Sequence, residues 1–135
     1  MNSIFPFDKH HFKSNSILDG LPKKELALLQ THLTTHTYKR GQIIFRQGGN
    51  PLGIYFLKKG KVKKYTSWDV GIEHIFYVCN SGELLGYHAV LSGEQYPDSA
   101  ATLEDSVISF IPRDDFLKVL EKSQVLSNRL LKSLS

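Results

Sequence analysis

The residues best suited to chemistry lie in two short segments on either side of a polar loop. Residues 82–86 read GELLG and residues 97–101 read PDSAA. The first segment places a lone carboxylate, Glu83, between two glycines, and the second places Ser99 before two alanines. Backbone amides and a serine hydroxyl can bind phosphate oxygens, while a carboxylate accepts hydrogen bonds from sugar hydroxyls. The two segments therefore predict a site for a small anionic ligand that carries hydroxyl groups.

Asp98 argues against an anionic ligand, because it stands where a phosphate site most needs a cation. A carboxylate about 4 Å from a phosphate adds a repulsion of about 4 kcal/mol at an effective dielectric constant of about 20. Each 1.4 kcal/mol changes affinity about tenfold, so a micromolar phosphate site would weaken to millimolar or worse. Ligand binding at this site remains possible in two ways. Either a nearby Lys or Arg neutralises Asp98, or the ligand is neutral or cationic at that point.

The elements that position these segments follow from the spacing of apolar residues and glycines. Apolar residues recur every three to five positions across residues 17–33, which predicts an amphipathic helix. Between residues 34 and 112, glycines separate short apolar runs, as expected for strands joined by turns. The expected strands are residues 43–45, 54–57, 61–67, 73–78, 100–103 and 107–111. Many short strands of this kind indicate a sandwich or a jelly-roll barrel, and helical spacing returns after Pro112.

Composition excludes several classes of protein. A chain of 135 residues is expected to form one domain with a core of its own. No apolar run approaches the roughly 20 residues that span a bilayer. Cys79 is the only cysteine, which excludes an intrachain disulfide and an iron–sulfur cluster held by several cysteines. The first residues lack the features of a secretory signal, so we expect a cytoplasmic protein.

The positive charge of the chain is spread along its length. Seventeen Lys and Arg against thirteen Asp and Glu give a formal net charge of +4. The basic residues form local doublets rather than one long run, which is typical of a solvated surface. Residues 58–64 are the most plausible basic patch, and any attraction of DNA to them would be weak and sensitive to salt.

Three glycine-anchored motifs resemble those of the cyclic-nucleotide-binding domain. They are residues 38–48 (YKRGQIIFRQG), 54–63 (IYFLKKGKVK) and 82–86 (GELLG). More narrowly, the chain resembles the sensor half of bacterial transcription regulators related to the cyclic AMP receptor protein and the fumarate-nitrate regulator. The resemblance implies a mainly β fold with flanking helices, in which eight strands form a jelly-roll (double-stranded β-helix) barrel. It also implies a short helix near residues 87–91 and a long carboxy-terminal dimerisation helix.

The domain organisation implied by this resemblance has three parts. We expect a loose segment at residues 1–16, the sensor domain at residues 17–121, and the start of the dimerisation helix at residues 122–135. In such regulators a helix-turn-helix domain follows that helix and reads the DNA. The expected partners are thus a second copy of the chain, an unidentified small-molecule effector, and DNA only through a helix-turn-helix domain that these residues do not include. No membrane is expected.

The resemblance also implies roles for single residues. Glu83 matches the carboxylate that accepts a hydrogen bond from the ribose 2′-OH, and Asp98 replaces the arginine that binds the phosphate. Ser99 matches part of the phosphate cradle. The full candidate ligand-binding set is Gly82, Glu83, Leu84, Asp98, Ser99 and Ala100. Binding of cyclic AMP or cyclic GMP is not expected, and no cofactor is expected.

Simpler interpretations of the same residues stay open. Glu83 and Asp98 are also suited to turns, where a carboxylate binds local backbone N–H groups. Ser99 suits the cap of a turn, and Gly82 and Gly86 suit backbone conformations with positive φ. Three side chains are expected beside the cavity, where packing is a commoner role than recognition. These are Tyr87, His88 and Tyr96.

Two other functions remain as alternatives to an effector-sensing domain. The first is a ligand-free scaffold that dimerises without sensing. The second is a jelly-roll metalloenzyme, which would need a His-x-His pair that this sequence lacks. His32 and His36 have the spacing of a helical metal pair, but the helix is expected to end near residue 33. Haem sensing would need an axial ligand such as His88 or Cys79. No catalytic motif is found, so we expect no enzyme and no metal site.

Overall fold

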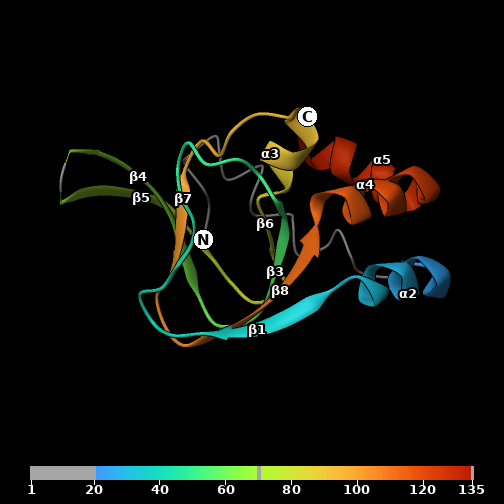
Figure 1. Ribbon diagram of the computed structural model, residues 1–135, viewed down its shortest axis with the longest axis horizontal. Coiled ribbons are helices and arrows are strands. Elements are labelled where there is room, and N and C mark those ends of the chain that lie inside the picture. The colour runs from blue at the N-terminus through green and yellow to red at the C-terminus, as the bar shows by residue number, and fades with distance from the viewer. Residues whose placement is uncertain (1–20, 70, 135) are drawn as a thin grey trace.

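The computed structural model describes residues 21–69 and 71–134, and these form eight strands and four helices (Figure 1). The segment 1–16 that we expect to be loose lies outside the described residues, as does the start of the helix expected at residues 17–33. Two layers of antiparallel strands carry a group of helices on one side (Figure 1). The predicted mainly β jelly-roll fold with flanking helices is confirmed.

Each of the two sheets has four strands, in the orders β1-β8-β3-β6 and β2-β7-β4-β5. The strands are β1 Thr34–Tyr38, β2 Ile43–Phe45, β3 Gly53–Lys59, β4 Val62–Asp69, β5 Ile72–Cys79, β6 Leu84–Leu85, β7 Ser99–Thr102 and β8 Ser106–Pro112. All six expected strands are present. The apolar runs did not predict β1, which is polar and mostly exposed, or β6, which has two residues.

The four described helices are α2 Lys23–Thr31, α3 Tyr87–Ser92, α4 Arg113–Lys122 and α5 Gln124–Leu134. Pro22 and Pro112 precede α2 and α4, where a missing N–H leaves no helical bond unmade. Helix α2 ends at Thr31, so His32 and His36 do not share a helix. Instead, the Nδ1 of His32 lies 3.6 Å from a carboxylate oxygen of Asp115 on α4. None of the described helices is long and apolar enough to cross a membrane.

Strand β3 divides the apolar residues into two cores. Successive side chains of a strand point to opposite faces of the sheet. Ile54 and Phe56 therefore pack toward α2, α4 and α5, whereas Tyr55 and Leu57 pack between the two sheets. Helix-side core and barrel core are used below for these two clusters. The helix-side core contains Leu21, Leu29, Ile54, Leu84, Tyr87, Val90, Ile111, Phe116, Val119, Leu126 and Leu130. The barrel core contains Phe45, Leu57, Val62, Cys79, Leu85, Ala89, Tyr96, Ala100 and Ile108.

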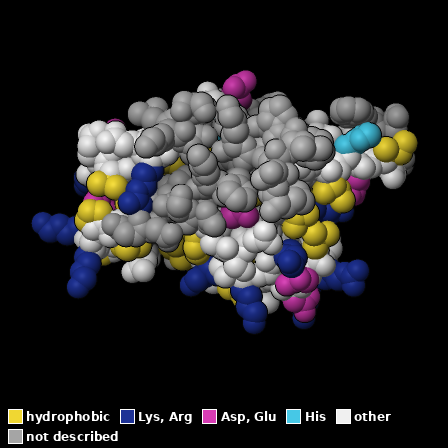
Figure 2. All heavy atoms as spheres, turned by 180° about the vertical axis from the view of Figure 1, so that it is seen from behind, with side chains coloured by type: hydrophobic (Ala, Val, Ile, Leu, Met, Phe, Trp, Pro, Cys, Tyr) yellow, Lys and Arg dark blue, Asp and Glu magenta, His cyan; other side chains and the backbone are white. Residues whose placement is uncertain are grey.

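The surface carries charges of both signs. On the face seen in Figure 2, Lys and Arg side chains project separately around the lower edge, with Asp and Glu side chains among them. This arrangement fits the solvated surface that the sequence predicts. Repulsion between like charges is reduced when they are spread in this way.

Helix α5 packs onto its own chain. Leu126 and Leu130 are almost fully buried in the helix-side core, and Ser123 caps the helix by accepting a hydrogen bond from the Leu126 N–H at 3.0 Å. Val125 is 38% exposed. The side chains of Leu131 and Leu134 lie outside the described residues. At least two apolar side chains of the helix expected to mediate dimerisation thus stabilise the single chain.

This packing predicts an asymmetry between neighbouring positions of α5. Leu126→Ala removes fully buried carbons and is expected to lower the free energy of unfolding by about 2–5 kcal/mol. Val125→Ala is the matched control, and less than about 1 kcal/mol is expected because its side chain is partly exposed. Urea unfolding of both variants measures the difference. Equal losses would contradict the burial of Leu126 in the helix-side core.

Candidate ligand-binding site

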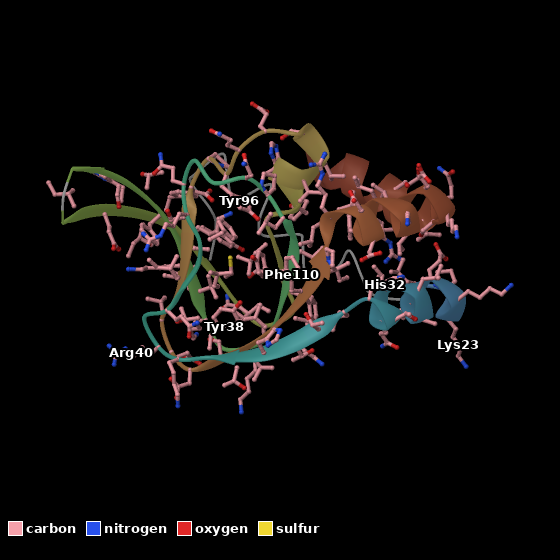
Figure 3. All side chains as sticks on the ribbon, viewed as in Figure 1. Lys23, His32, Tyr38, Arg40, Tyr96 and Phe110 are labelled. Atoms are coloured by element: carbon pink, nitrogen blue, oxygen red, sulfur yellow. The ribbon has the colours of Figure 1, made fainter. Side chains whose placement is uncertain are left out.

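A cavity of about 280 Å³ lies where β2, β4, β5, β6, α3 and the loop before β7 meet. Tyr87, His88 and Tyr96 line it, which confirms their predicted position beside the cavity. Figure 3 shows Tyr96 among the side chains that lie between the two layers of strands, below α3. The walls are mainly aromatic and aliphatic. Two charged side chains, Lys64 and Asp98, interrupt them.

Lys64 and Asp98 form a buried ion pair in the cavity wall. The Nζ of Lys64 lies 3.3 Å from Oδ1 of Asp98, and each residue is only 5% exposed. Burial raises the pKa of Asp98, while the Lys64 ammonium and His88 act in the opposite direction. The strand register brings this pair together. Lys64 stands opposite Ala100 in the pairing of β4 with β7, and Asp98 lies two positions before Ala100. The structure thus supplies the neutralising lysine that Asp98 needs.

The sequence interpretation was wrong about the location of Lys64. It was counted with the exposed basic patch of residues 58–64, yet it is buried. The alternation of β4 carries the missed signal. Val62 is fully buried in the barrel core, so the side chain two positions later points the same way. Lys63, between them, points outward and pairs with Glu73.

The carboxylate of Glu83 accepts hydrogen bonds from nearby residues of its own chain. One of its carboxylate oxygens accepts a hydrogen bond from the Tyr77 hydroxyl at 2.6 Å, and the other accepts one from the Asn80 N–H at 2.7 Å. Glu83 is 4% exposed and is not among the cavity-lining residues. Gly82 adopts a φ of 97° and donates its N–H to the Leu57 carbonyl. This geometry supports the interpretation of Glu83 as a carboxylate that stabilises a turn.

Ser99 and Ala100 are also committed to the fold. The Ser99 Oγ accepts a hydrogen bond from the Gln47 N–H at 2.8 Å, and both residues lie buried in β7. Of the six candidate residues, Leu84 and Asp98 line the cavity. The other four lie outside its lining. A ligand role for Gly82, Glu83, Ser99 and Ala100 stays a prediction.

Aromatic rings form a large part of the cavity wall, and the sequence motifs did not predict two of them, Phe45 and Phe76. The Phe45 and Tyr96 rings stack with their centroids 4.0 Å apart and their planes at 14°. The Lys64 ammonium lies 5.8 Å from the centre of the Phe45 ring. Gly86 has a φ of 82°, and a Cβ there would lie 3.3 Å from the Tyr96 ring. Glycine at this position therefore lets α3 begin close to the aromatic wall.

Cys79 offers no reactive thiolate to a ligand. It is 1% exposed in the barrel core, and burial raises the pKa of its thiol. A protonated, enclosed thiol is a poor metal or haem ligand. Of the two axial ligands considered from the sequence, only His88 lines the cavity.

The barrel has a short helix after a Gly-Glu-Leu turn, and the cavity beneath that helix is close in size to small-molecule sites. The sequence matches the cyclic nucleotide-binding domain family over residues 35–123, and the chain belongs to this family. The family assignment agrees with the resemblance seen in the three glycine-anchored motifs.

Two relatives illustrate the breadth of this similarity. The chain is 25% identical over 118 residues to the cyclic AMP receptor protein of Thermus thermophilus, covering 87% of this chain and 55% of the relative. It is 29% identical over 97 residues to the fumarate and nitrate reduction regulatory protein of Vibrio cholerae, covering 72% of this chain and 38% of the relative. This chain thus spans about half the length of the first relative and less of the second.

Solved structures show the same fold. The crystal structure of the Thermus thermophilus catabolite activator protein superposes with a TM-score of 0.77 at 25% identity, covering 87% of this chain and 55% of that one. The sensor domain of the transcriptional regulator DNR from Pseudomonas aeruginosa superposes with a TM-score of 0.76 at 23% identity. That match covers 90% of this chain and 86% of the sensor domain.

The role of Glu83 in its loop predicts a stability effect. Tyr77→Phe removes only the hydroxyl that donates to Glu83, and it is expected to lower the free energy of unfolding by about 1–2 kcal/mol. The control is Tyr55→Phe, since the described residues give the Tyr55 hydroxyl no hydrogen bond, and less than about 0.5 kcal/mol is expected. Chemical denaturation measures both. A negligible loss in Tyr77→Phe would contradict a stabilising role for this hydrogen bond.

Proposed function

We propose that this chain is the effector-sensing domain of a bacterial transcription regulator and that its effector is not a cyclic nucleotide. The observation that carries the second part is the buried Lys64–Asp98 pair in the cavity wall. The first part is supported by the relatives, which are named as a cyclic AMP receptor protein and as fumarate and nitrate reduction regulators. We propose a cytoplasmic location and no enzymatic activity.

The ion pair leaves a phosphate without a strong partner. A phosphate gains most from a cation that is not already paired, and the Lys64 ammonium faces the Asp98 carboxylate at 3.3 Å. To bind a phosphate, Lys64 would have to leave Asp98 as a buried carboxylate without its partner, which is strongly unfavourable. The hydrogen bonds of Glu83 and Ser99 to their own chain reduce what is available for ribose and phosphate.

Two residues connect the cavity to the helices. Leu84 and Tyr87 line the cavity and also belong to the helix-side core, where Phe116 of α4 and Leu126 of α5 are packed. A ligand that prefers one position of Tyr87 therefore biases the packing of α4 and α5. A ligand shifts the equilibrium between two packing arrangements of these helices only if it binds one arrangement more tightly than the other. We propose this as the route from effector to regulator output.

Rejection of cyclic nucleotides is tested by calorimetric titration. We expect no low-micromolar binding of cyclic AMP or cyclic GMP to the 135-residue chain, because both place a phosphate anion beside Asp98. In Asp98→Asn the lysine is no longer paired with a carboxylate, so the affinity for cyclic AMP is expected to rise at least about tenfold. Asp114→Asn, at an exposed position of α4, is the charge-matched control. A low-micromolar dissociation constant for the unmodified chain would overturn the proposal.

We propose that the chain pairs with a second copy through α5 and that DNA is read by a region other than the sheets and helices described. The apolar side chain of Val125 is 38% exposed on α5. Val125→Lys is expected to weaken dimerisation at least about tenfold, since it places a charge in an apolar contact. Ile72→Lys, at an apolar position of β5 that is 51% exposed, is the control. Sedimentation over a concentration series measures both, and equal behaviour of the two variants would argue against a dimer contact at Val125.

The ligand-free scaffold makes a different prediction from effector sensing. A scaffold that does not sense would show no ligand-dependent change in thermal stability, whereas a ligand at 100 times its dissociation constant adds about 2.7 kcal/mol. No observation favours the metalloenzyme. Among the described residues, no group of three or more His, Cys, Asp or Glu is arranged to hold a metal ion.

A further inference from the structure

The cavity combines aromatic walls with an ion pair whose charges cancel. Lys64 and Asp98 are each only 5% exposed, and the Nζ of Lys64 lies 3.3 Å from Oδ1 of Asp98. An anionic ligand would leave this site with a net negative charge, and a cationic ligand would leave it with a net positive charge. Either excess charge is costly where little water can solvate it. A neutral ligand preserves the balance.

The Oδ1 atom of Asp98 can accept a further hydrogen bond. Its Oδ1 is buried, and apart from the Lys64 ammonium at 3.3 Å no described group stands in hydrogen-bonding geometry to it. An ionised carboxylate oxygen has two acceptor sites, and leaving one unused in a buried place is unfavourable. Lys64 is a donor with three N–H bonds. A ligand group with a donor beside an acceptor would meet both side chains at once.

The walls specify the rest of the ligand. Phe45 and Tyr96 present a stacked pair of rings, and Phe76 lies in the same lining. Aromatic rings pack well against other flat apolar groups in offset or edge-on contact. A volume of about 280 Å³ lies at the small end of ligand pockets, which suits a molecule of one or two rings.

We infer that the effector bound in this cavity is a small uncharged aromatic molecule whose polar group both donates a hydrogen bond to Asp98 and accepts one from Lys64. An aromatic carboxamide has this chemistry. The inference rests on the proposed function, since it names the ligand class of the same sensing site. It goes further in fixing the charge, the ring system and the polar group.

Four probes of nearly equal shape test the inference. Benzamide is neutral with a donor and an acceptor, benzoate is anionic, benzamidine is cationic at neutral pH, and acetophenone is neutral with an acceptor only. Their dissociation constants are measured by nitrogen-15 NMR titration of the 135-residue chain, following the backbone amides of Gly86 and Tyr96 beside the cavity. We expect benzamide to bind at least about tenfold more tightly than benzoate or benzamidine, and at least about threefold more tightly than acetophenone.

Two charge variants make the test sharper. Asp98→Asn leaves the lysine with no carboxylate partner, so benzoate is expected to become the preferred probe. Lys64→Met leaves the carboxylate with no ammonium partner, so benzamidine is expected to become preferred. Lys61→Met is the matched control at an exposed position next to β4, and it should keep the order of the unmodified chain. Where a variant does not fold, the order of the four probes on the unmodified chain still decides.

The possible outcomes separate the inference from the proposed function. Benzoate or benzamidine binding as well as benzamide to the unmodified chain would overturn the inference, and so would binding of none of the four probes. Neither result touches the rejection of cyclic nucleotides, which the calorimetric titration decides separately. Tight binding of cyclic AMP would overturn the proposed rejection of cyclic nucleotides whichever order the four probes show.

Discussion

The antiparallel pairing of β3 with β8 is the constraint on which the rest of the structure depends. Residues 53–59 pair with residues 107–112, and this central pair gives both of its faces to apolar cores. The pairing is close at its start, because a Cβ at Gly53 would lie 2.2 Å from the Ile111 carbonyl oxygen. Only glycine fits there without movement of the backbone. Helices can therefore pack on one side while the second sheet encloses a cavity on the other.

The cavity exists because several of the buried residues around it are polar or small. Its lining includes Gly86 and Ala89, and large side chains at these positions would fill the space. The remaining space is bounded by aromatic rings and by one ion pair. Burying two charges is expensive, and an apolar pair of similar size is often at least as stable. Stability alone therefore does not explain the Lys64–Asp98 pair, which agrees with the recognition role that we propose for it.

The sequence predicted the fold better than it predicted the site. Turn glycines and apolar runs located six strands, since each strand leaves a local pattern in the residues themselves. The polar strand β1 left none and became visible only through its pairing with β8. The site depends on pairing between distant segments. Asp98 was recognised as a misfit from its own segment, but its partner Lys64 lies 34 positions earlier and is placed by the register of β4 against β7.

The position of Glu83 shows a second limit of prediction from the sequence. A family motif predicts the residue type at a position, and a glycine-flanked carboxylate fits both a ribose contact and a turn. Which of the two holds depends on where nearby donors point, here the Tyr77 hydroxyl from β5 and the Asn80 N–H. Both lie in the same stretch of chain as Glu83, so they were visible in the sequence, but their direction was not.

Charge balance links the ligand to the helices. Asp98 and Lys64 lie on the side of the cavity formed by the second sheet, whereas Leu84 and Tyr87 lie between the cavity and α4 and α5. In the mechanism we propose, a ligand held by its polar group at the ion pair presents its apolar end toward the opposite wall. Its length then decides how far Tyr87 is displaced. On this proposal, polar recognition fixes where the ligand sits, and apolar packing converts the ligand's size into a change in the helix-side core, because an interior packed at crystal-like density transmits small displacements.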